Sequence, residues 1–485
     1  MATLTHPEPA EAASSADGYR HLIDGRLVGS SQSFDVFDPA TGEVFAQCPS
    51  ADRADLDRAV AAAKRAFPAW SRTPIAERRA MLAAFAQRIR DDAEALHPLL
   101  TREQGKPLAD SLGELQRIGD HIEGMASLPL DSVVLSEGPR ERIEMRWRPL
   151  GVVGAIAPWN VPVALGMHKV AHALYTGNTI VLKPSPYTPL TTLAVGALAV
   201  GIFPDGVFNV LAGGNELGAL MTGHPDIDKV SFTGSVATGK KVAASSADSL
   251  KRVTLELGGN DPAVVLADAD VEAAADGIAR SAFANCGQIC MAVKRVYVAA
   301  PLYDQMVAAL VKRAEAIVWG PGTRPGVRMG PIQNAMQYDK VASVIDRTRA
   351  DPAAKFETGG QLPGGPGYFV PPTIVTGLAD DAALVCEEQF GPVLPILRYE
   401  DEADAIRRAN DTRFGLGASV WGSDTAHAAA VGQQLEAGQV WVNRHGGNPV
   451  NVPFGGAKES GLGREHGVEG LRSYMEMQIV TVPVA

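Results

Sequence analysis

A repeated alternation of strand-like and helix-like segments is the feature that most constrains the fold of this chain. Between residues 151 and 265, short runs rich in β-branched residues alternate with helical stretches; the runs are VVGAIAP, NTIVLKP, VFNVLAG, KVSFTG and VTLELGG. Such runs are typical of parallel strands that are buried on both faces and joined by helical crossovers. Residues 266–445 repeat the pattern. The sequence therefore predicts an α/β protein with two α/β domains.

The segments that flank this alternation have other patterns. Residues 1–18 are rich in Ala, Ser, Pro and Glu, which predicts a flexible tail. Residues 20–48 resemble short strands, whereas residues 51–115 have the i, i+3, i+4, i+7 spacing of apolar positions that is typical of helices. Residues 126–148 return to an extended pattern, and the chain ends on the strand-like run MQIVTVPV. Both extended segments are typical of strands that pair with another segment.

Composition and charge exclude several classes of protein. The chain has 485 residues, of which 46% are hydrophobic, as in an ordinary globular enzyme. Its formal net charge is −11 and it has no basic run, so we expect no nucleic-acid partner. It also has no uncharged apolar stretch of about 18 residues and no secretory signal pattern. We therefore expect no membrane span and a cytoplasmic location.

The four cysteines are too few for a disulfide framework in a chain of this length. We expect Cys48 and Cys386 to be free, buried and inert thiols. Cys286 and Cys290 have the i, i+4 spacing of possible metal ligands, but no second Cys or His pair lies nearby in the sequence. The sequence therefore predicts no metal site.

Three polar side chains at predicted strand ends or loop junctions are candidates for covalent chemistry. Cys290 lies in FANCGQICMAVKR, at a junction where the pKa of a thiol can be lowered. Glu256 ends the run VTLELGG, where partial burial raises the pKa of a carboxyl towards that of a useful base. Asn160, in APWNVP, can donate to a developing oxyanion. Taken singly, each also has a structural interpretation, as a buried thiol, a solvated or capping carboxylate and a capping amide.

Two further segments are candidates for phosphate recognition. The dinucleotide motif G-x-G-x-x-G is absent, but FTGSVATGKK places Gly234 and Ser235 between a strand and a helix. A helix N-terminus with exposed N–H groups can bind a pyrophosphate. Lys183, in IVLKPSP at another strand end, can bond a ribose hydroxyl or a phosphate, or can simply be solvated.

Taken together, these segments resemble the signature segments of the aldehyde dehydrogenase superfamily, in its non-acylating, NAD(P)-dependent form. LELGGNDP is similar to the glutamate signature of the family and FANCGQICMAVK to its cysteine signature, while APWN, LKPS, FTGS, EEQFGPV and PFGGAKESGLGRE occur in the family's order. The resemblance covers about residues 20–480. It implies oxidation of an aldehyde to a carboxylic acid through a thiohemiacetal and a thioester.

The resemblance also implies roles for single residues. Cys290 resembles the nucleophile, Glu256 the base, and Asn160 the side-chain donor of the oxyanion hole. Glu388 resembles the carboxylate that holds the nicotinamide ribose, with Phe390 beside it.

The remaining cofactor contacts also rest on the resemblance. Lys183 resembles the lysine that binds the adenosine ribose, and Ser185 lies in the same LKPS segment. Trp159, Gly234 and Ser235 resemble further contacts to the cofactor. NAD is the implied cofactor.

The domain organisation implied by the resemblance combines a Rossmann-like domain, a catalytic domain and a small β arm. We expect residues 19–125 and 149–256 to form the NAD(P)-binding domain, and residues 257–446 the catalytic domain. We expect residues 126–148 and 473–485 to form the oligomerisation arm, and residues 447–472 to return to the active site. The arm implies a homodimer or a homotetramer.

Two departures from the family pattern affect the cofactor and the substrate. Pro186 stands where NAD-preferring relatives often have a glutamate, so NADP remains possible. Val161, Leu165, His168 and Phe454 are the expected pocket residues, and the loop HGGNPVNVP lacks large aromatics. We therefore expect a roomy pocket for a medium-chain or aromatic aldehyde.

Three alternatives remain open at this point. A CoA-acylating aldehyde dehydrogenase would use the same cysteine but typically lacks the base assigned to Glu256. A cysteine esterase or thiol hydrolase would need a histidine base, and no histidine motif accompanies Cys290. A non-catalytic relative would not need Cys290, Glu256 and Asn160 together.

Overall fold

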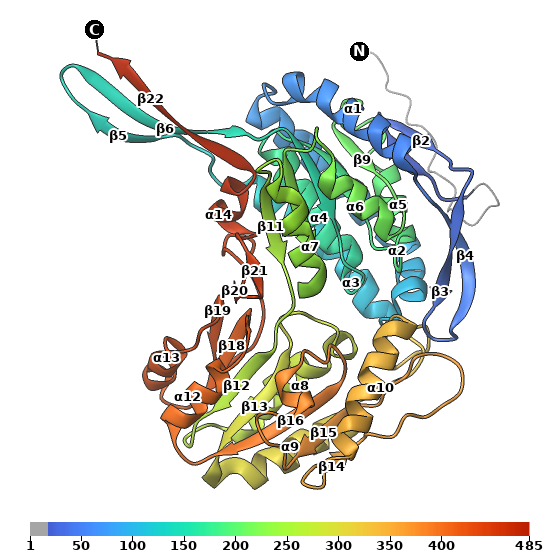
Figure 1. Ribbon diagram of the computed structural model, residues 1–485, viewed down its shortest axis with the longest axis vertical. Coiled ribbons are helices and arrows are strands. Elements are labelled where there is room, and N and C mark those ends of the chain that lie inside the picture. The colour runs from blue at the N-terminus through green and yellow to red at the C-terminus, as the bar shows by residue number, and fades with distance from the viewer. Residues whose placement is uncertain (1–17, 485) are drawn as a thin grey trace.

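The computed structural model describes residues 18–484, which form two α/β lobes with separate sheets and a projecting β arm (Figure 1). The tail predicted at residues 1–18 lies outside the described residues except for its last position. The α/β class predicted from the alternation of strands and helices is confirmed.

The first sheet has eight strands in the order β2-β1-β9-β8-β7-β10-β11-β21. Its central strands β9, β8, β7, β10 and β11 are parallel, and the strands at both edges pair antiparallel. The strands are β1 (His21–Ile23), β2 (Arg26–Val28), β7 (Val152–Ile156), β8 (Thr179–Lys183), β9 (Phe208–Val210), β10 (Lys229–Thr233), β11 (Arg252–Glu256) and β21 (Gly461–Leu462).

Helices cover both faces of this sheet because its β-branched strands are apolar on both faces. Val152 packs into one buried cluster and the next residue, Val153, into the cluster on the opposite face. Helices α1, α6 and α7 contribute to the first cluster, and α2 to α5 to the second. The helices are α1 (Arg53–Trp70), α2 (Ile75–Gln104), α3 (Leu108–Ala126), α4 (Pro162–Tyr175), α5 (Leu190–Ala197), α6 (Asn215–Gly223) and α7 (Val236–Ala247).

The second sheet has seven strands in the order β14-β15-β16-β13-β12-β18-β19, and only the edge strand β14 is antiparallel to its neighbour. A third buried cluster lies between this sheet and its helices. The strands are β12 (Asp261–Val265), β13 (Val293–Ala299), β14 (Lys355–Thr358), β15 (Thr373–Thr376), β16 (Val393–Tyr399), β18 (Gly417–Trp421) and β19 (Gln439–Val442). The helices are α8 (Val271–Phe283), α9 (Tyr303–Glu315), α10 (Ala335–Arg349), α11 (Ala383–Cys386), α12 (Glu402–Asn410) and α13 (Thr425–Gly432), with the 3-10 turns η1 (Ala284–Gly287) and η2 (Ala300–Leu302).

A short link joins the two sheets. Strand β11 ends at Glu256 and β12 begins at Asp261, so residues 257–260 carry the chain from the carboxyl edge of one sheet to the amino edge of the other. Strand β13 pairs with β12 in parallel, with Val293 opposite Asp261. Residues that precede β13 therefore face residues that follow the strands of the first sheet. The chain thus passes from the first sheet to the second directly after residue 256, where the domain boundary was predicted. The limits of the domains themselves stay a prediction.

A three-stranded antiparallel sheet projects from the body of the molecule (Figure 1). It consists of β5 (Val133–Glu137), β6 (Glu141–Pro149) and the C-terminal β22 (Met475–Pro483), with β6 in the centre. The smaller elements are the paired strands β3 (Ser33–Asp38) and β4 (Glu43–Pro49), the paired strands β17 (Phe414–Gly415) and β20 (Ala457–Lys458), and the helix α14 (Gly467–Arg472).

One expectation about the cysteines is wrong. Cys48 is buried as expected, but Cys386 is exposed, because it ends the short helix α11 at the surface. Among the described residues, no helix combines the length and the apolar character that crossing a membrane requires.

Candidate active site

Cys290 lies in the turn that precedes β13, at the amino edge of the second sheet. Its side chain is half-buried. The ammonium of Lys294 donates to the carbonyl oxygens of Cys290 at 2.6 Å and Ile289 at 2.8 Å, which fixes the turn. Upstream, Asn285 and Cys286 have left-handed backbone conformations with φ of 49° and 58°. Strained backbone of this kind persists only where surrounding contacts hold it.

The electrostatic surroundings of Cys290 favour the neutral thiol. Burial raises its pKa to about 12, and the carboxylates of Glu256, Asp261 and Glu388 raise it further, while the Lys294 ammonium opposes the rise. The thiolate is the nucleophilic form of cysteine. The thiol therefore needs a base, or a change of surroundings, before it can attack.

Glu256 is the last residue of β11 and its side chain is buried. Neither carboxyl oxygen has a hydrogen-bond partner among the residues described. Burial raises its pKa well above the ordinary value, and the negative charge of Glu465 adds to that rise. The positive charges of Lys169 and Arg464 oppose the rise, and Lys169 is itself paired with Glu465. Once ionised, a carboxyl with a raised pKa is a stronger base than a solvated one.

Asn160 ties the first sheet to the Cys290 turn. It is buried and lies in the loop between β7 and α4. Its side-chain Nδ2 donates to the carbonyl of Gln288 at 2.8 Å, which leaves the second N–H of the amide for another acceptor. The backbone carbonyl of Asn160 accepts from Asn285 Nδ2 at 2.9 Å and from Lys106 Nζ at 3.1 Å.

Glu388 and Phe390 lie in the loop before β16, at the same amino edge of the second sheet as Cys290. Glu388 accepts from the backbone N–H of Gly259 at 3.0 Å and lies 3.9 Å from the Lys294 ammonium. The ring of Phe390 meets that of Trp159 edge to face, with 5.3 Å between centroids. Residues from both sheets therefore meet here.

Lys183 and Ser185 lie at and just beyond the carboxyl end of β8, and both are buried. The Lys183 ammonium donates to the carbonyl of Pro184 at 3.2 Å. Burial lowers its pKa to about 8. Since an ammonium has three donors, a single long contact leaves Lys183 able to bond an additional polar group.

Gly234 and Ser235 connect β10 to the twelve-residue helix α7. Ser235 caps the helix by accepting from the backbone N–H of Thr238 at 3.3 Å. A Cβ at Gly234 would lie 2.5 Å from the ring of Phe232, so only glycine fits between this strand and helix. The cap satisfies one of the first N–H groups of the helix, and the others can bind an anion.

The four expected pocket residues come from two segments. Val161, Leu165 and His168 have i, i+4, i+7 spacing at the start of α4 and are all half-buried, so they share one face of the helix. Phe454 is buried, and its backbone forms a bridge with Glu465. Its ring lies 6.1 Å from that of His466.

A hollow of about 390 Å³ opens beside the Cys290 turn. Ile289 and Met291, the two neighbours of Cys290, line it, together with Gly446 and Gly447 of the glycine-rich loop. Arg280 and the loop residues from Asn443 to His445 also lie on its wall.

The structure brings the predicted residues to one junction: Asn160, Lys183, Gly234 and Glu256 follow strands of the first sheet, and Cys290 and Glu388 precede strands of the second. Four polar residues that hold the site together were not singled out from the sequence, namely Lys294, Asn285, Lys169 and Glu465. Lys294 and Asn285 lie within the cysteine motif and Glu465 within the C-terminal motif, but only the fold shows their contacts.

Substituting Glu256→Gln tests the burial of this carboxyl. Because the folded pKa is raised, the protonated form stabilises the fold, and that stability is lost as pH rises from about 4.5 towards the folded pKa. We expect the variant to match the wild type near pH 5 and to exceed its free energy of unfolding by about 1–3 kcal/mol near pH 8.5, as when an unpaired buried charge is removed. Denaturant unfolding at both pH values measures the difference.

Glu216→Gln, on the exposed first turn of α6, is the matched control and should show no such pH-dependent gain. A stability difference for Glu256→Gln that is the same at both pH values would contradict the raised pKa.

Known proteins are similar to this chain over nearly its whole length. Residues 27–480 match the aldehyde dehydrogenase family. The chain is 39% identical to a 2-hydroxymuconic semialdehyde dehydrogenase of Pseudomonas putida, over 96% of this chain and 99% of the relative. The solved NAD+ complex of a Bacillus cereus aldehyde dehydrogenase superposes with a TM-score of 0.94 at 36% identity, covering 97% of both chains. A solved NADP-dependent enzyme of E. coli gives 0.93 at 35%, covering 96% of this chain and 98% of the other. The chain therefore belongs to the aldehyde dehydrogenase family and has its fold.

Proposed function

We propose that this aldehyde dehydrogenase oxidises its substrate to a carboxylic acid through a covalent intermediate on Cys290, and that Glu256 is the base. The observation that carries the proposal is the meeting of three groups at the junction of the sheets. They are a half-buried thiol, a buried carboxyl with no hydrogen-bond partner among the described residues and an amide that binds the thiol's turn.

The first steps follow from the surroundings of the thiol. The ionised Glu256 carboxylate accepts the thiol proton, directly or through water, and burial favours this transfer because it raises the pKa of the carboxyl. The sulfur then attacks the aldehyde carbon, and the free N–H of the Asn160 amide stabilises the developing oxyanion. When bound, the nicotinamide cofactor supplies the hydride acceptor for this oxidation.

Release of the product needs a water molecule. The acyl group remains on Cys290 as a thioester. After it has passed the thiol proton to solvent, Glu256 removes a proton from the attacking water; the C–S bond then breaks, the acid is released and the Cys290 sulfur takes up a proton again. Breaking one oxidation into acylation and hydrolysis is the usual advantage of covalent catalysis. The Glu256 carboxyl is free for this second use because no other described residue binds its oxygens.

The residues at the carboxyl edge of the first sheet fit a dinucleotide. Lys183 has donors to spare for a ribose hydroxyl, and Ser185 lies beside it. The N-terminus of α7, with Gly234 and Ser235, would receive the pyrophosphate. Glu388, held by Gly259, would bind the nicotinamide ribose, with Phe390 and Trp159 beside it.

NAD is the first choice of cofactor and NADP the second. Pro186 leaves no carboxylate at its position to repel a 2′-phosphate. Solved relatives include both an NAD+ complex and an NADP-dependent enzyme.

The substrate we propose is a medium-chain or aromatic aldehyde. Val161, Leu165, His168 and Phe454 would form its wall, and the hollow beside Ile289 supports a roomy entrance. The Pseudomonas putida relative is by name a dehydrogenase of 2-hydroxymuconic semialdehyde.

Cys290→Ser tests the covalent step. We expect kcat for acid formation from benzaldehyde and NAD+ to fall at least about 1,000-fold, because serine lacks a comparably acidic nucleophile. Absorbance of the reduced cofactor and chromatography of benzoate measure this fall. In the same assay, the wild-type enzyme should give a lower kcat/KM with acetaldehyde than with benzaldehyde.

Cys386→Ser is the control, because it replaces an exposed thiol that has no part in the proposed mechanism, and it should retain full activity. Unchanged turnover in Cys290→Ser would refute the mechanism. Acyl-CoA as the product in the presence of CoA would favour the acylating alternative, and ester cleavage without reduced cofactor would favour a hydrolase.

Lys183→Ala tests the cofactor site. We expect the KM for NAD+ and that for NADP+ each to rise about tenfold or more, because a charge-assisted hydrogen bond contributes about 1.5–3 kcal/mol. Lys241→Ala, exposed on α7, is the control and should leave both values unchanged. Equal KM values for wild type and Lys183→Ala would place the cofactor elsewhere.

We propose that the β arm joins copies of this chain into a dimer or tetramer. The edge strand β5 of the arm is exposed throughout. Apolar side chains lie on the surface of the arm, among them Leu135 of β5 (53% exposed) and Ile479 of β22 (51%). Exposed apolar edges of this kind seek partners.

The double substitution Leu135→Lys/Ile479→Lys is expected to weaken assembly, because it places charges in an apolar contact. Light scattering coupled to size-exclusion chromatography should give a smaller mass than for the wild type. Val318→Lys, equally exposed (55%) but in the second lobe, is the control and should assemble normally. Wild-type assembly in the arm variant would exclude the arm as the contact.

A further inference from the structure

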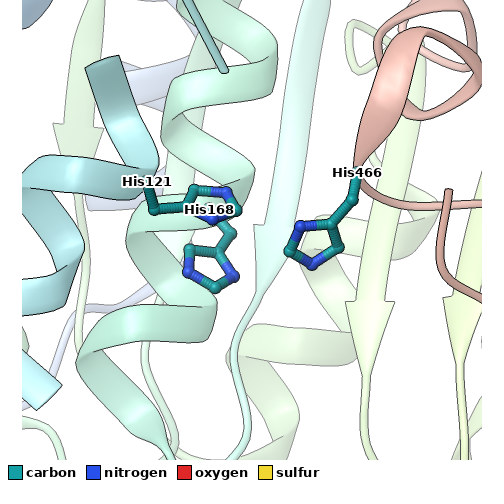
Figure 2. A group of neighbouring side chains, drawn as sticks. All are labelled: His121, His168 and His466. Carbon is teal, nitrogen blue, oxygen red and sulfur yellow. The ribbon is translucent and has the colours of Figure 1, made fainter. Parts of the chain in front are cut away.

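Three histidines from separate parts of the chain meet in the first lobe, outside the groups used above for catalysis. His121 comes from α3, His168 from α4, and His466 immediately precedes α14 (Figure 2). Each offers one ring nitrogen, and the three nitrogens lie within 4.8 Å of one another. Figure 2 shows His466 facing the other two rings from the opposite side.

Each of these imidazoles keeps a buried nitrogen without a hydrogen-bond partner among the residues described. These atoms are His121 Nε2, His168 Nδ1 and His466 Nδ1. The side chain of His466 is more than nine-tenths buried, with 7% of the residue exposed. A buried polar atom without a partner destabilises the fold, so three in one place point to a ligand that satisfies them together.

The neighbouring His172 shows what a structural histidine in this region looks like. Its Nδ1 contacts the carbonyl of His168 at 2.5 Å, and its Nε2 accepts from the backbone N–H of His466 at 3.2 Å. Both ring nitrogens of His172 are therefore used. The contact also holds the backbone of His466, whose φ of 59° is unusual for a residue with a side chain.

The three rings pack directly against one another. His121 and His168 stack with their centroids 3.5 Å apart, and His466 meets them edge-on at 4.8 and 5.2 Å. Burial lowers the pKa of all three, that of His121 to about 2, so that the imidazoles are neutral. Neutral imidazole is the form that binds metal ions.

We propose that His121, His168 and His466 bind a single divalent transition-metal ion of the zinc class, each through one ring nitrogen. An atom in the middle of the triangle lies about 2.8 Å or less from each nitrogen. The stacked rings of His121 and His168 would turn apart on binding, so that both in-plane lone pairs point at the ion at a zinc–imidazole bond length. Three ligands leave further coordination positions for water or another ligand.

The donor set selects the class of ion. Imidazole nitrogen suits zinc, nickel and copper, whereas calcium and magnesium require oxygen ligands. The nearest carboxylate in the sequence, Glu465, is paired with Lys169 and is not part of the triangle.

The metal site lies beside the residues that we propose to form the wall of the substrate pocket. The binding of an ion does not itself depend on the proposed function. His168 follows Val161 and Leu165 on one face of α4, and His466 lies beside Phe454. A bound ion would therefore add a fixed positive charge beside the proposed path of the aldehyde.

Direct metal binding tests the proposal. Tag-free, full-length protein carrying Cys290→Ser, which removes the half-buried active-site thiol as a competing ligand, is stripped with a chelator and titrated with Zn²⁺ against a chromophoric chelator. We expect about one tightly bound ion per chain. His121→Gln and His466→Asn should each weaken binding at least about tenfold; asparagine is chosen because it tolerates the positive φ at position 466.

His427→Gln is the matched control, because His427 is exposed and paired with Glu402 at 2.8 Å. It should bind zinc as the parent does, and zinc should raise the thermal midpoint of the parent and the control but not of the two cluster variants. Zinc affinity that is equal in all variants, or a parent that binds no zinc at micromolar concentration, would overturn the proposal.

Discussion

The rest of the site depends on the close passage of the chain between its two sheets. A Cβ on Gly258 would lie 2.1 Å from a Glu388 oxygen, and one on Gly259 would lie 2.7 Å from the carbonyl of Cys290. A side chain at either glycine would collide with these groups of the second lobe. The two glycines therefore let the carboxyl end of β11 approach the turn before β13, where Glu256 lies close enough to act on the thiol of Cys290 electrostatically.

Buried lysines then hold the parts that this contact brings together. Lys294 fixes the Cys290 turn through backbone carbonyls, and Lys106 donates to the carbonyl of Asn160 while pairing with Glu114 at 2.5 Å. Such groups are costly to bury unless they are paired and hydrogen-bonded. Glu256 differs because it is buried beside charges without bonding to them, which keeps its carboxyl available for proton transfer.

The sequence was sufficient to predict the α/β class and the placing of Asn160, Lys183 and Glu256 at strand ends, because the periodicity of buried strands is a local signal. Their chemical roles came from the family resemblance and stay predictions. The exposure of Cys386 was missed, since a four-residue helix at the surface leaves no periodic pattern. The histidine cluster was missed as well: His121 and His466 are far apart in the chain, and only tertiary packing brings them together.

The most direct test of the account is mass spectrometry of the wild-type enzyme, quenched in acid during its first turnovers of benzaldehyde and NAD+. If Cys290 forms the thioester, a benzoyl group should appear on the peptide that contains Cys290 and should decay as benzoate is released. An unmodified Cys290 peptide alongside full reduction of the cofactor, or the benzoyl group on another residue, would contradict the mechanism.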